Sequence, residues 1–194
     1  RVAEHPNIAS VIIDNRKSGY EVTKHLIEQG CTDIIHITAN LLRNVYHDRM
    51  SGYRQALEDR NIPFRDNRVI VTDLSEEAGV ETAKKILAMK KLPDGIFAAN
   101  DACAVNCLIT LKQAGVNIPK DIAIAGFNNS PISQVVEPQL TTVDYPAREM
   151  GEVAMNNLIN HLKGTSSISA TNTIILRSDL IVRGSSLRKA TVHK

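Results

Sequence analysis

The chain has 194 residues, of which 43% are hydrophobic and 23% charged, and its formal net charge is +2 at pH 7. This composition is typical of a globular protein with one or two domains, and the near-neutral charge argues against a strongly basic nucleic-acid-binding surface. The apolar runs are too short for a membrane span, and three cysteines, an odd number, argue against a secreted disulfide framework.

Apolar runs and helical patterns alternate along the chain. Continuous apolar or β-branched runs predict strands, and apolar residues recurring every three or four positions predict helices. In chain order the predicted elements are strand 10–13, a helix carrying Val22 and Leu26, strand 34–37, helix 45–60, strand 69–71, a helix carrying Ala83 and Ile86, strand 96–99, a helix carrying Val105 and Leu108, strand 122–125, a helix from Pro146 to Leu162, and strands 173–176 and 180–182. Strands separated by helices need crossover connections, so the pattern predicts an α/β fold with mostly parallel sheets.

Polar side chains follow nearly every predicted strand. Ligands of open parallel sheets bind beyond the carboxyl ends of the strands, where the loops emerge. A ring of short donors and acceptors at this edge suits a hydroxyl-rich ligand. Asparagine and aspartate are also common in turns and as helix N-caps, and at any single position this interpretation is equally good. The residues concerned are Asp14, Asn15, Asn40, Asp73, Asn100, Asp101, Asn128 and Asn129.

No motif of an enzyme is found. The chain lacks a G-x-S-x-G elbow, a phosphate-binding G-x-x-x-x-G-K-[ST] loop, an H-E-x-x-H pair and a G-x-G-x-x-G turn. His36 falls within an apolar strand and is predicted to be a core histidine. Cys103 and Cys107, four residues apart, could share a metal, but two small apolar residues on a buried helix face are the simpler interpretation. We therefore expect neither catalysis nor a bound metal or cofactor.

Several motifs, in a specific order, resemble the effector-binding core of LacI/GalR-type bacterial transcription regulators. The resemblance covers essentially the whole chain, although each motif alone is weak. The motifs are Asp14-Asn15…Gly19 followed by His25-Leu26, Arg49-x-x-Gly52-Tyr53-x-x-Ala56-Leu57, Asn100-Asp101-x-x-Ala104, Pro119-x-Asp121-Ile122, Gly126-Phe127-Asn128-Asn129, Pro138-x-Leu140-Thr141-Thr142-Val143 and Arg183-Gly184-Ser185. One departure is Asn128, where the family usually has aspartate, and it puts any copied sugar specificity in doubt.

The resemblance implies a periplasmic-binding-protein-like fold of type I. Two Rossmann-like subdomains with parallel sheets are joined by crossover segments, and the effector binds in the cleft between them. Residues 1–42 and 144–166 are assigned to the first subdomain, which is expected to be incomplete, and 43–143 and 167–194 to the second. The family's helix-turn-helix headpiece is missing from this chain, so operator DNA is expected to bind only through such a headpiece. Family members are homodimers, and we expect a dimer or a larger assembly.

Effector contacts can be carried over from the family by position. Arg49 stands where the family arginine holds ligand hydroxyls or a carboxylate, because a guanidinium offers five donors in a rigid fork. We expect its side chain in a solvated cleft and not in the core, although a salt bridge on the helix surface is the plain alternative. Arg43 and Val45 lie in the preceding loop, at positions that line the pocket in several members. Asn128 is expected to contact the ligand from the same subdomain as Arg49.

The remaining candidates bind or support the same ligand. Asn100 and Asp101 are expected to bond sugar-like hydroxyls or to brace the loops that do. Leu74 stands where sugar-binding members often have an aromatic ring, and Tyr145 could supply that surface or be an ordinary packed crossover residue. Ile13 and Asp14 would approach the ligand from the first subdomain.

Two function classes remain open. The leading one is the effector-sensing domain of a DNA-binding regulator, with a small, sugar-like effector as partner and a cytoplasmic location. The alternative is a solute-binding protein that feeds a transporter and shares the fold. The Arg49-x-x-Gly52 helix and the segment 116–143 resemble the regulators more closely.

Overall fold

The chain folds into two compact units, and the polypeptide passes from one to the other three times. The computed structural model describes residues 8–165 and 173–188. Unit 1 consists of Arg1–Asp14 and Tyr145–Ser178, and unit 2 of Asn15–Asp144 and Asp179–Lys194. The passages therefore lie at 14–15, 144–145 and 178–179.

Unit 2 is built on a four-stranded parallel sheet with the strand order β3-β2-β4-β5. The strands are β2 (Ile34–Thr38), β3 (Val69–Val71), β4 (Gly95–Ala98) and β5 (Ala123–Ala125). In the register, Ile37 pairs with Ile70 and Ala98, and Ile96 pairs with Ile124. The α/β prediction with parallel strands is confirmed.

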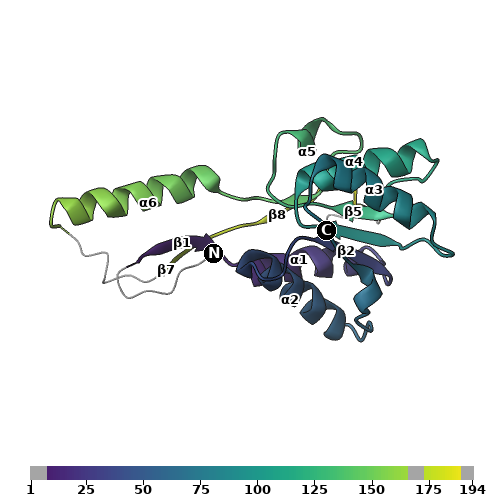
Figure 1. The fold of residues 1–194 in the computed structure, drawn as a ribbon, viewed down its shortest axis with the longest axis horizontal. Coiled ribbons are helices and arrows are strands. Elements are labelled where there is room, and N and C mark those ends of the chain that lie inside the picture. Colours follow the sequence, from purple (N-terminus) through teal and green to yellow (C-terminus); the bar gives the residue numbers. More distant parts are fainter. Residues whose placement is uncertain (1–7, 166–172, 189–194) are drawn as a thin grey trace, which may run out of the picture. The chain divides into compact units, whose positions relative to one another are not determined.

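Helices cover both faces of this sheet. They are α1 (Asn15–Glu28), α2 (Asn44–Glu58), α3 (Glu76–Leu87) and α4 (Asp101–Gln113). Helices α1 and α2 lie on one face and α3 and α4 on the other (Figure 1). Alternate strand residues, such as Ile35, Ile37 and Ile96, join the core with α3 and α4, because side chains in a strand point alternately to the two faces. Short elements complete the unit: η1 (Asp66–Arg68), α5 (Ile132–Val135), β6 (Thr142–Val143) and β8 (Leu180–Ile181).

Helices α1 and α2 approach each other so closely that their backbones touch at two glycines. A Cβ atom built on Gly52 would lie 2.1 Å from the carbonyl oxygen of Arg16, and one built on Gly19 would lie 2.3 Å from that of Arg49. Real Cβ atoms do not approach backbone this closely. Glycine is therefore required at both positions by the packing of the two helices.

The face of the sheet that meets α2 contains a buried histidine. The ring of His36 stacks on Phe97 at 4.5 Å and on Tyr53 at 5.2 Å between centroids. Its Nδ1 lies 3.0 Å from the carbonyl oxygen of Phe97, while Nε2 has no hydrogen-bond partner in the described part of the chain. The pKa of His36 is lowered to about 4. Burial is the main cause and the nearby Arg49 charge adds to it, while the hydrogen bond to Phe97 acts in the opposite direction. The prediction of a core histidine is confirmed.

This histidine is expected to make the protein less stable in mild acid. Its folded pKa lies below the unfolded value of 6.5, so the unfolded state binds the proton first. The stability is fully present above pH 6.5 and is lost as the pH falls toward 4, by about 3 kcal/mol in total. Urea unfolding at pH 7, 6 and 5 measures the first part of this loss, about 2 kcal/mol by pH 5, which should be much smaller in His36→Gln.

The matched control is His47→Gln, since His47 is exposed on α2. It should keep the acid sensitivity of the wild type, part of which comes from His25, whose pKa burial also lowers. An equal pH dependence in His36→Gln and the wild type would contradict the prediction.

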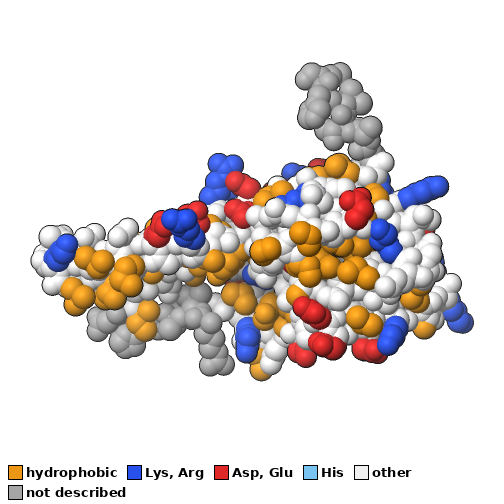
Figure 2. All heavy atoms as spheres, turned by 90° about the horizontal axis from the view of Figure 1, so that it is seen from above, with side chains coloured by type: hydrophobic (Ala, Val, Ile, Leu, Met, Phe, Trp, Pro, Cys, Tyr) orange, Lys and Arg blue, Asp and Glu red, His pale blue; other side chains and the backbone are white. Residues whose placement is uncertain are grey.

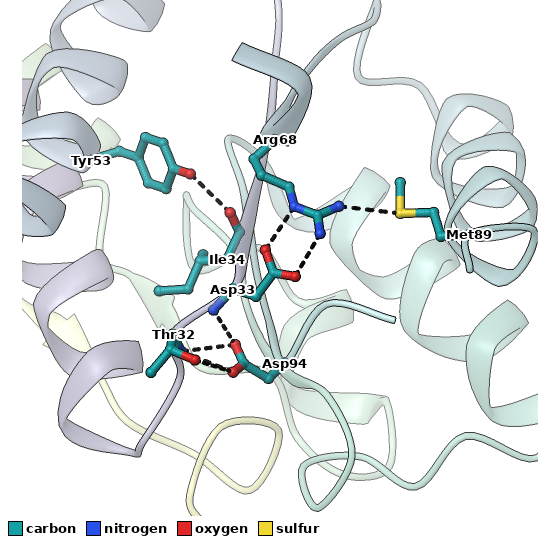
Figure 3. Close-up of polar contacts among 7 residues, drawn as sticks. All are labelled: Thr32, Asp33, Ile34, Tyr53, Arg68, Met89 and Asp94. Carbon is teal, nitrogen blue, oxygen red and sulfur yellow. Dashed lines mark hydrogen bonds and ion pairs between the residues drawn. The ribbon is translucent and has the colours of Figure 1, made fainter. Parts of the chain in front are cut away.

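Structural bonds fill the amino-terminal edge of the unit 2 sheet (Figure 3). The Asp94 carboxylate accepts from the backbone N–H of Thr32 at 2.9 and 3.0 Å and from that of Asp33 at 2.8 Å. Arg68 makes a bidentate pair with Asp33 at 2.7 and 2.5 Å. Because these groups satisfy one another, their bonds hold together the loops at this edge.

Unit 1 contains a two-stranded parallel sheet and one long helix. Strands β1 (Ser10–Ile13) and β7 (Thr173–Leu176) pair, and α6 (Ala147–Leu162) packs beside β1. No residue of α6 is buried, and Figure 2 shows hydrophobic side chains along its length. An open apolar hollow within this unit is lined by Ile8, Ala9, Val11, Met150, Gly151, Ala154, Asn157 and Leu158.

The division of the chain differs from the prediction at its first boundary. Residues 15–42 were assigned to the first subdomain, but β2 pairs with β3 and β4, and α1 packs on α2, so these residues belong to unit 2. The later boundaries also move, because β7 pairs with β1 and places 173–176 in unit 1. The Ser- and Thr-rich composition of residues 164–170 predicts a loop, and this segment lies mostly outside the described residues.

The three cysteines are free and buried. Burial raises the pKa of Cys31 and of Cys103 to about 12, and it also raises the pKa of Cys107. The interpretation of Cys103 and Cys107 as buried apolar residues is confirmed. Within the described ranges, no helix combines the length and the apolar composition that crossing a bilayer requires.

Candidate functional site

The carboxyl ends of the four parallel strands of unit 2 lie along one edge of the sheet. We call the loops that follow them, 38–40, 72–74, 99–101 and 126–129, the strand-end edge. Backbone bonds hold the loops in register: the N–H of residue 72 donates to the carbonyl of 38 at 2.8 Å, and that of 99 to the carbonyl of 37 at 2.8 Å. The polar residues that the sequence places after each strand therefore come together.

Arg49 reaches this edge from α2, and its side chain is buried. Its Nη1 donates to the carbonyl oxygen of Ala99 at 2.8 Å, and its Nε donates to Oδ1 of Asn15 at 2.9 Å. The guanidinium carbon lies 3.5 Å from the ring centroid of Phe127. With 5% of its surface exposed, Arg49 is not in a solvated cleft, and that expectation is corrected. The α1–α2 contact and the stack on Phe127 enclose the side chain, and it orders the edge.

Asn100 and Asp101 both brace the loops of the edge. The Asn100 amide caps α4 by accepting from the N–H of Cys103 at 2.9 Å and donates to the carbonyl oxygen of Leu74 at 2.9 Å. The Asp101 carboxylate is fully buried and accepts from the Ser130 N–H at 2.7 Å and the Thr142 hydroxyl at 2.6 Å. Burial raises the pKa of Asp101, and these hydrogen bonds oppose the rise. Of the two roles considered for this pair, the geometry supports bracing.

The loop after β5 carries an exposed asparagine in an unusual conformation. Asn128 has φ 111° and Asn129 has φ 52°, both in the left-handed region that few residues other than glycine and asparagine adopt. The Asn128 N–H donates to the carbonyl of Val143 at 3.0 Å, while its side chain is exposed. A held backbone with a free side chain is suited to presenting an amide to a ligand.

The other candidates are divided between the two units. Arg43 is exposed at the start of α2, and Val45 is half-buried in its first turn. Leu74, at 3% exposure, packs in the apolar core, so the expectation that it lines a pocket is corrected. Its φ of 62° turns the chain into α3 and directs its side chain inward. Ile13, Asp14 and Tyr145 belong to unit 1, whereas the strand-end edge belongs to unit 2.

Two further polar groups belong to this edge and to the helix that follows it. Oγ1 of Thr38 and Oδ1 of Asn44 are buried and have no hydrogen-bond partner among the described residues. Buried polar atoms without a partner are uncommon and often mark a place for water or a ligand. Thr38 directly follows the predicted strand 34–37, but no pattern in the sequence indicates its role, and Asn44 was missed.

The supporting residues were harder to find from the sequence. Asn15 and Phe127 belong to motifs that resemble the family's, but the sequence does not indicate that their side chains contact Arg49. Asn129 donates to Oδ1 of Asp144 at 2.9 Å and accepts from Nη2 of Arg183 at 2.8 Å. These bonds join residues 15 to 54 positions apart along the chain, and no local pattern contains such a distance.

Comparisons with known proteins agree with this architecture. A periplasmic binding protein-like domain model matches residues 23–186. The chain is 31% identical over 175 residues to the transcriptional repressor PurR of Actinobacillus pleuropneumoniae, covering 90% of this chain and 52% of that protein. It is 34% identical to the transcriptional regulator DegA of Bacillus subtilis, covering 90% and 51%. The chain therefore spans about half the length of these curated relatives, which are transcription regulators and not enzymes.

Solved structures give the same result. The transcription regulator CcpA of Lactococcus lactis is 32% identical, with a TM-score of 0.84 over 91% of this chain and 64% of that chain. A complex of the transcriptional regulator CelR with cellobiose has a TM-score of 0.85 at 28% identity, covering 94% and 55%. The predicted periplasmic-binding-protein-like fold is confirmed.

Proposed function

Because this chain belongs to the LacI/GalR family and carries its periplasmic-binding-protein-like domain, we propose that it is the effector-sensing domain of a DNA-binding transcription regulator. A small molecule binds at the strand-end edge of unit 2. The main observation behind this proposal is that four parallel strands end on one edge. There exposed Asn128 lies in a loop braced by buried Asp101. Exposed Arg43 precedes α2, and buried Arg49 bonds to the loop at Ala99.

The effector class that the edge supports is a small, sugar-like molecule with several hydroxyls. Such a ligand both donates and accepts hydrogen bonds. The edge and the start of α2 offer an amide at Asn128, a guanidinium at Arg43 and, on Thr38 and Asn44, oxygens that have no partner among the described residues. The sugar bound by the structural relative CelR supports the same class. Ile13, Asp14 and Tyr145 of unit 1 remain candidates for contacts with it.

Assembly and DNA binding complete the proposal. Regulators of this family act on operator DNA, and a two-fold dimer matches the symmetry of two operator half-sites. We propose a homodimer in which helix α1 takes part, and DNA contact through a helix-turn-helix of the kind that regulators of this family carry. A cytoplasmic location follows from that role.

A thermal-shift screen tests the proposal. The chain is heated with members of four classes, namely sugars, sugar phosphates, nucleosides and purines. A compound that binds only the folded state adds to the free energy of unfolding, by about 2.7 kcal/mol at a hundred times Kd. The melting temperature therefore rises with the concentration of the compound. Failure of every class to shift the melting temperature at millimolar concentration would contradict the proposal.

A matched pair of variants locates the site. Asn128→Gly removes the exposed amide at φ 111°, where glycine fits without strain, and should weaken a confirmed compound about three- to tenfold. Asn61→Gly makes the same change at another exposed asparagine with φ 56° and should leave the affinity unchanged. Calorimetry measures both affinities, and an equal effect of the two variants would remove Asn128 from the site.

A further inference from the structure

The chain passes between the units at three places, and hydrogen bonds from unit 2 lie beside each of them. At the first passage, Asn15 accepts from Nε of Arg49. At the second, Asp144 accepts from the amide of Asn129 through its carboxylate. The third is tied to the second, because the Asp144 N–H donates to the carbonyl of Asp179 at 2.8 Å.

The Asn129 amide is the central group of the second passage. Its nitrogen donates to Oδ1 of Asp144, and its oxygen accepts from Nη2 of Arg183. Both ends are used with charged partners, which fixes the orientation of the amide. Arg183 is itself fixed, since its Nη1 donates to the carbonyl of Leu140 at 2.9 Å and to the hydroxyl of Ser133 at 3.0 Å.

The residue next to Asn129 is the exposed candidate for ligand contact. Asn128 forms an isolated parallel bridge with Asp144, and its N–H donates to the carbonyl of Val143. A displacement of the loop at Asn128 therefore acts on the last two residues of unit 2 before the chain passes to Tyr145. The side chain of Asn129 holds the two segments together where the backbone bridge ends.

We propose that Asn129 is a positioning residue that makes the ligand loop and the crossover at Asp144 move as one body. It transmits a change at Asn128 to the chain that leaves unit 2. The regulatory meaning of this coupling rests on the proposed function, but the coupling itself is a property of the free protein and can be measured without an effector.

The test is a reversal of the hydrogen bond. Asn129→Asp keeps an oxygen for Arg183 but removes the donor to Asp144 and sets two carboxylates against each other. The double variant Asn129→Asp with Asp144→Asn restores one donor and one acceptor in the opposite order. Asn61→Asp is the matched control, because Asn61 is exposed and has φ 56°, close to the 52° of Asn129.

Amide hydrogen exchange followed by NMR is the measurement. In Asn129→Asp the amides of Asn128 and Asp144 should both exchange about tenfold faster or more, while the amide of Ile37 in β2 keeps its protection. The double variant should return both rates to within about threefold of the wild type, and Asn61→Asp should change neither. Wild-type exchange at Asp144 in Asn129→Asp, or no recovery in the double variant, would overturn the proposal.

The exchange experiment also decides if Asn129→Asp unfolds locally or if no ligand is found. If Asn129→Asp loses protection throughout unit 2, Asn129→Gly replaces it, since glycine accepts φ 52° and introduces no charge, and the same two amides decide. A ligand screen without hits would contradict the proposed function but would leave the exchange result standing. Faster exchange of both amides in Asn129→Asp, with recovery in the double variant, supports the positioning role in either case.

Discussion

Replacing Arg49 by alanine is expected to lower the free energy of unfolding by about 3 kcal/mol or more. The side chain is 5% exposed and donates to Asn15 and to the carbonyl of Ala99, so its removal takes a charged donor away from two buried acceptors. The stack on Phe127 is lost as well. Urea unfolding followed by circular dichroism measures the change. A confirmed effector should also bind more weakly, because the strand-end edge loses its order.

The control for this variant is Arg43→Ala. Arg43 is exposed just before α2, and its replacement should change the stability by no more than about 0.5 kcal/mol. Arg49→Lys tests geometry, since a lysine cannot donate in two fixed directions, and most of the loss should remain. An Arg49→Ala variant as stable as the wild type would show that the buried contacts of Arg49 do not form in solution.

The second large effect is expected for Gly52→Ala, with a loss of about 3 kcal/mol. The new methyl group would lie 2.1 Å from the carbonyl oxygen of Arg16 and 2.6 Å from the nitrogen of Tyr20. Both atoms belong to the backbone of α1, so relief requires the two helices to separate. Because Gly19 touches the backbone of Arg49 across the same contact, the separation should also disturb the strand-end edge.

Gly151→Ala is the matched control, since Gly151 also lies within a helix. A Cβ atom there would meet no heavy atom within 4 Å. Alanine has the higher helix propensity, so the variant should be neutral or more stable by up to about 1 kcal/mol. Melting temperatures of the two variants decide the matter, and a similar loss in both would mean that the α1–α2 contact is looser than described.

Much of the fold could be predicted from the sequence because its signals are local. The run 96–99 is continuously apolar and the run 34–37 is apolar except for His36, and both belong to central strands of unit 2. The first domain boundary was predicted wrongly because the signal that decides it is not local. Hydrophobic periodicity indicates that α1 and β2 exist, but which sheet they join depends on pairing with β3 and β4, much later in the chain.

The candidate site shows the same limit. The motifs predicted which residues follow the strands, and the parallel sheet brings Asn100 and Asn128 to one edge of unit 2. They did not predict environment: Arg49 was expected in solvent and is buried, and Leu74 was expected at a pocket and lies in the core. The burial of Arg49 depends on the close packing of α1 on α2, and that of Leu74 on the core shared with α3 and α4. A motif letter contains no information on either contact.

The burial of all three native thiols has a practical consequence for measuring motion in this protein. A thiol that is enclosed and has a raised pKa reacts slowly with maleimides and other labels, because the thiolate is the reactive form. A spin label or fluorophore offered to the folded chain will therefore attach to a cysteine introduced on the surface. One such position in each unit, for example Glu58 on α2 and Glu152 on α6, gives a labelled pair in the otherwise native sequence. Distances between the labels can then be followed during effector titration without first replacing Cys31, Cys103 or Cys107.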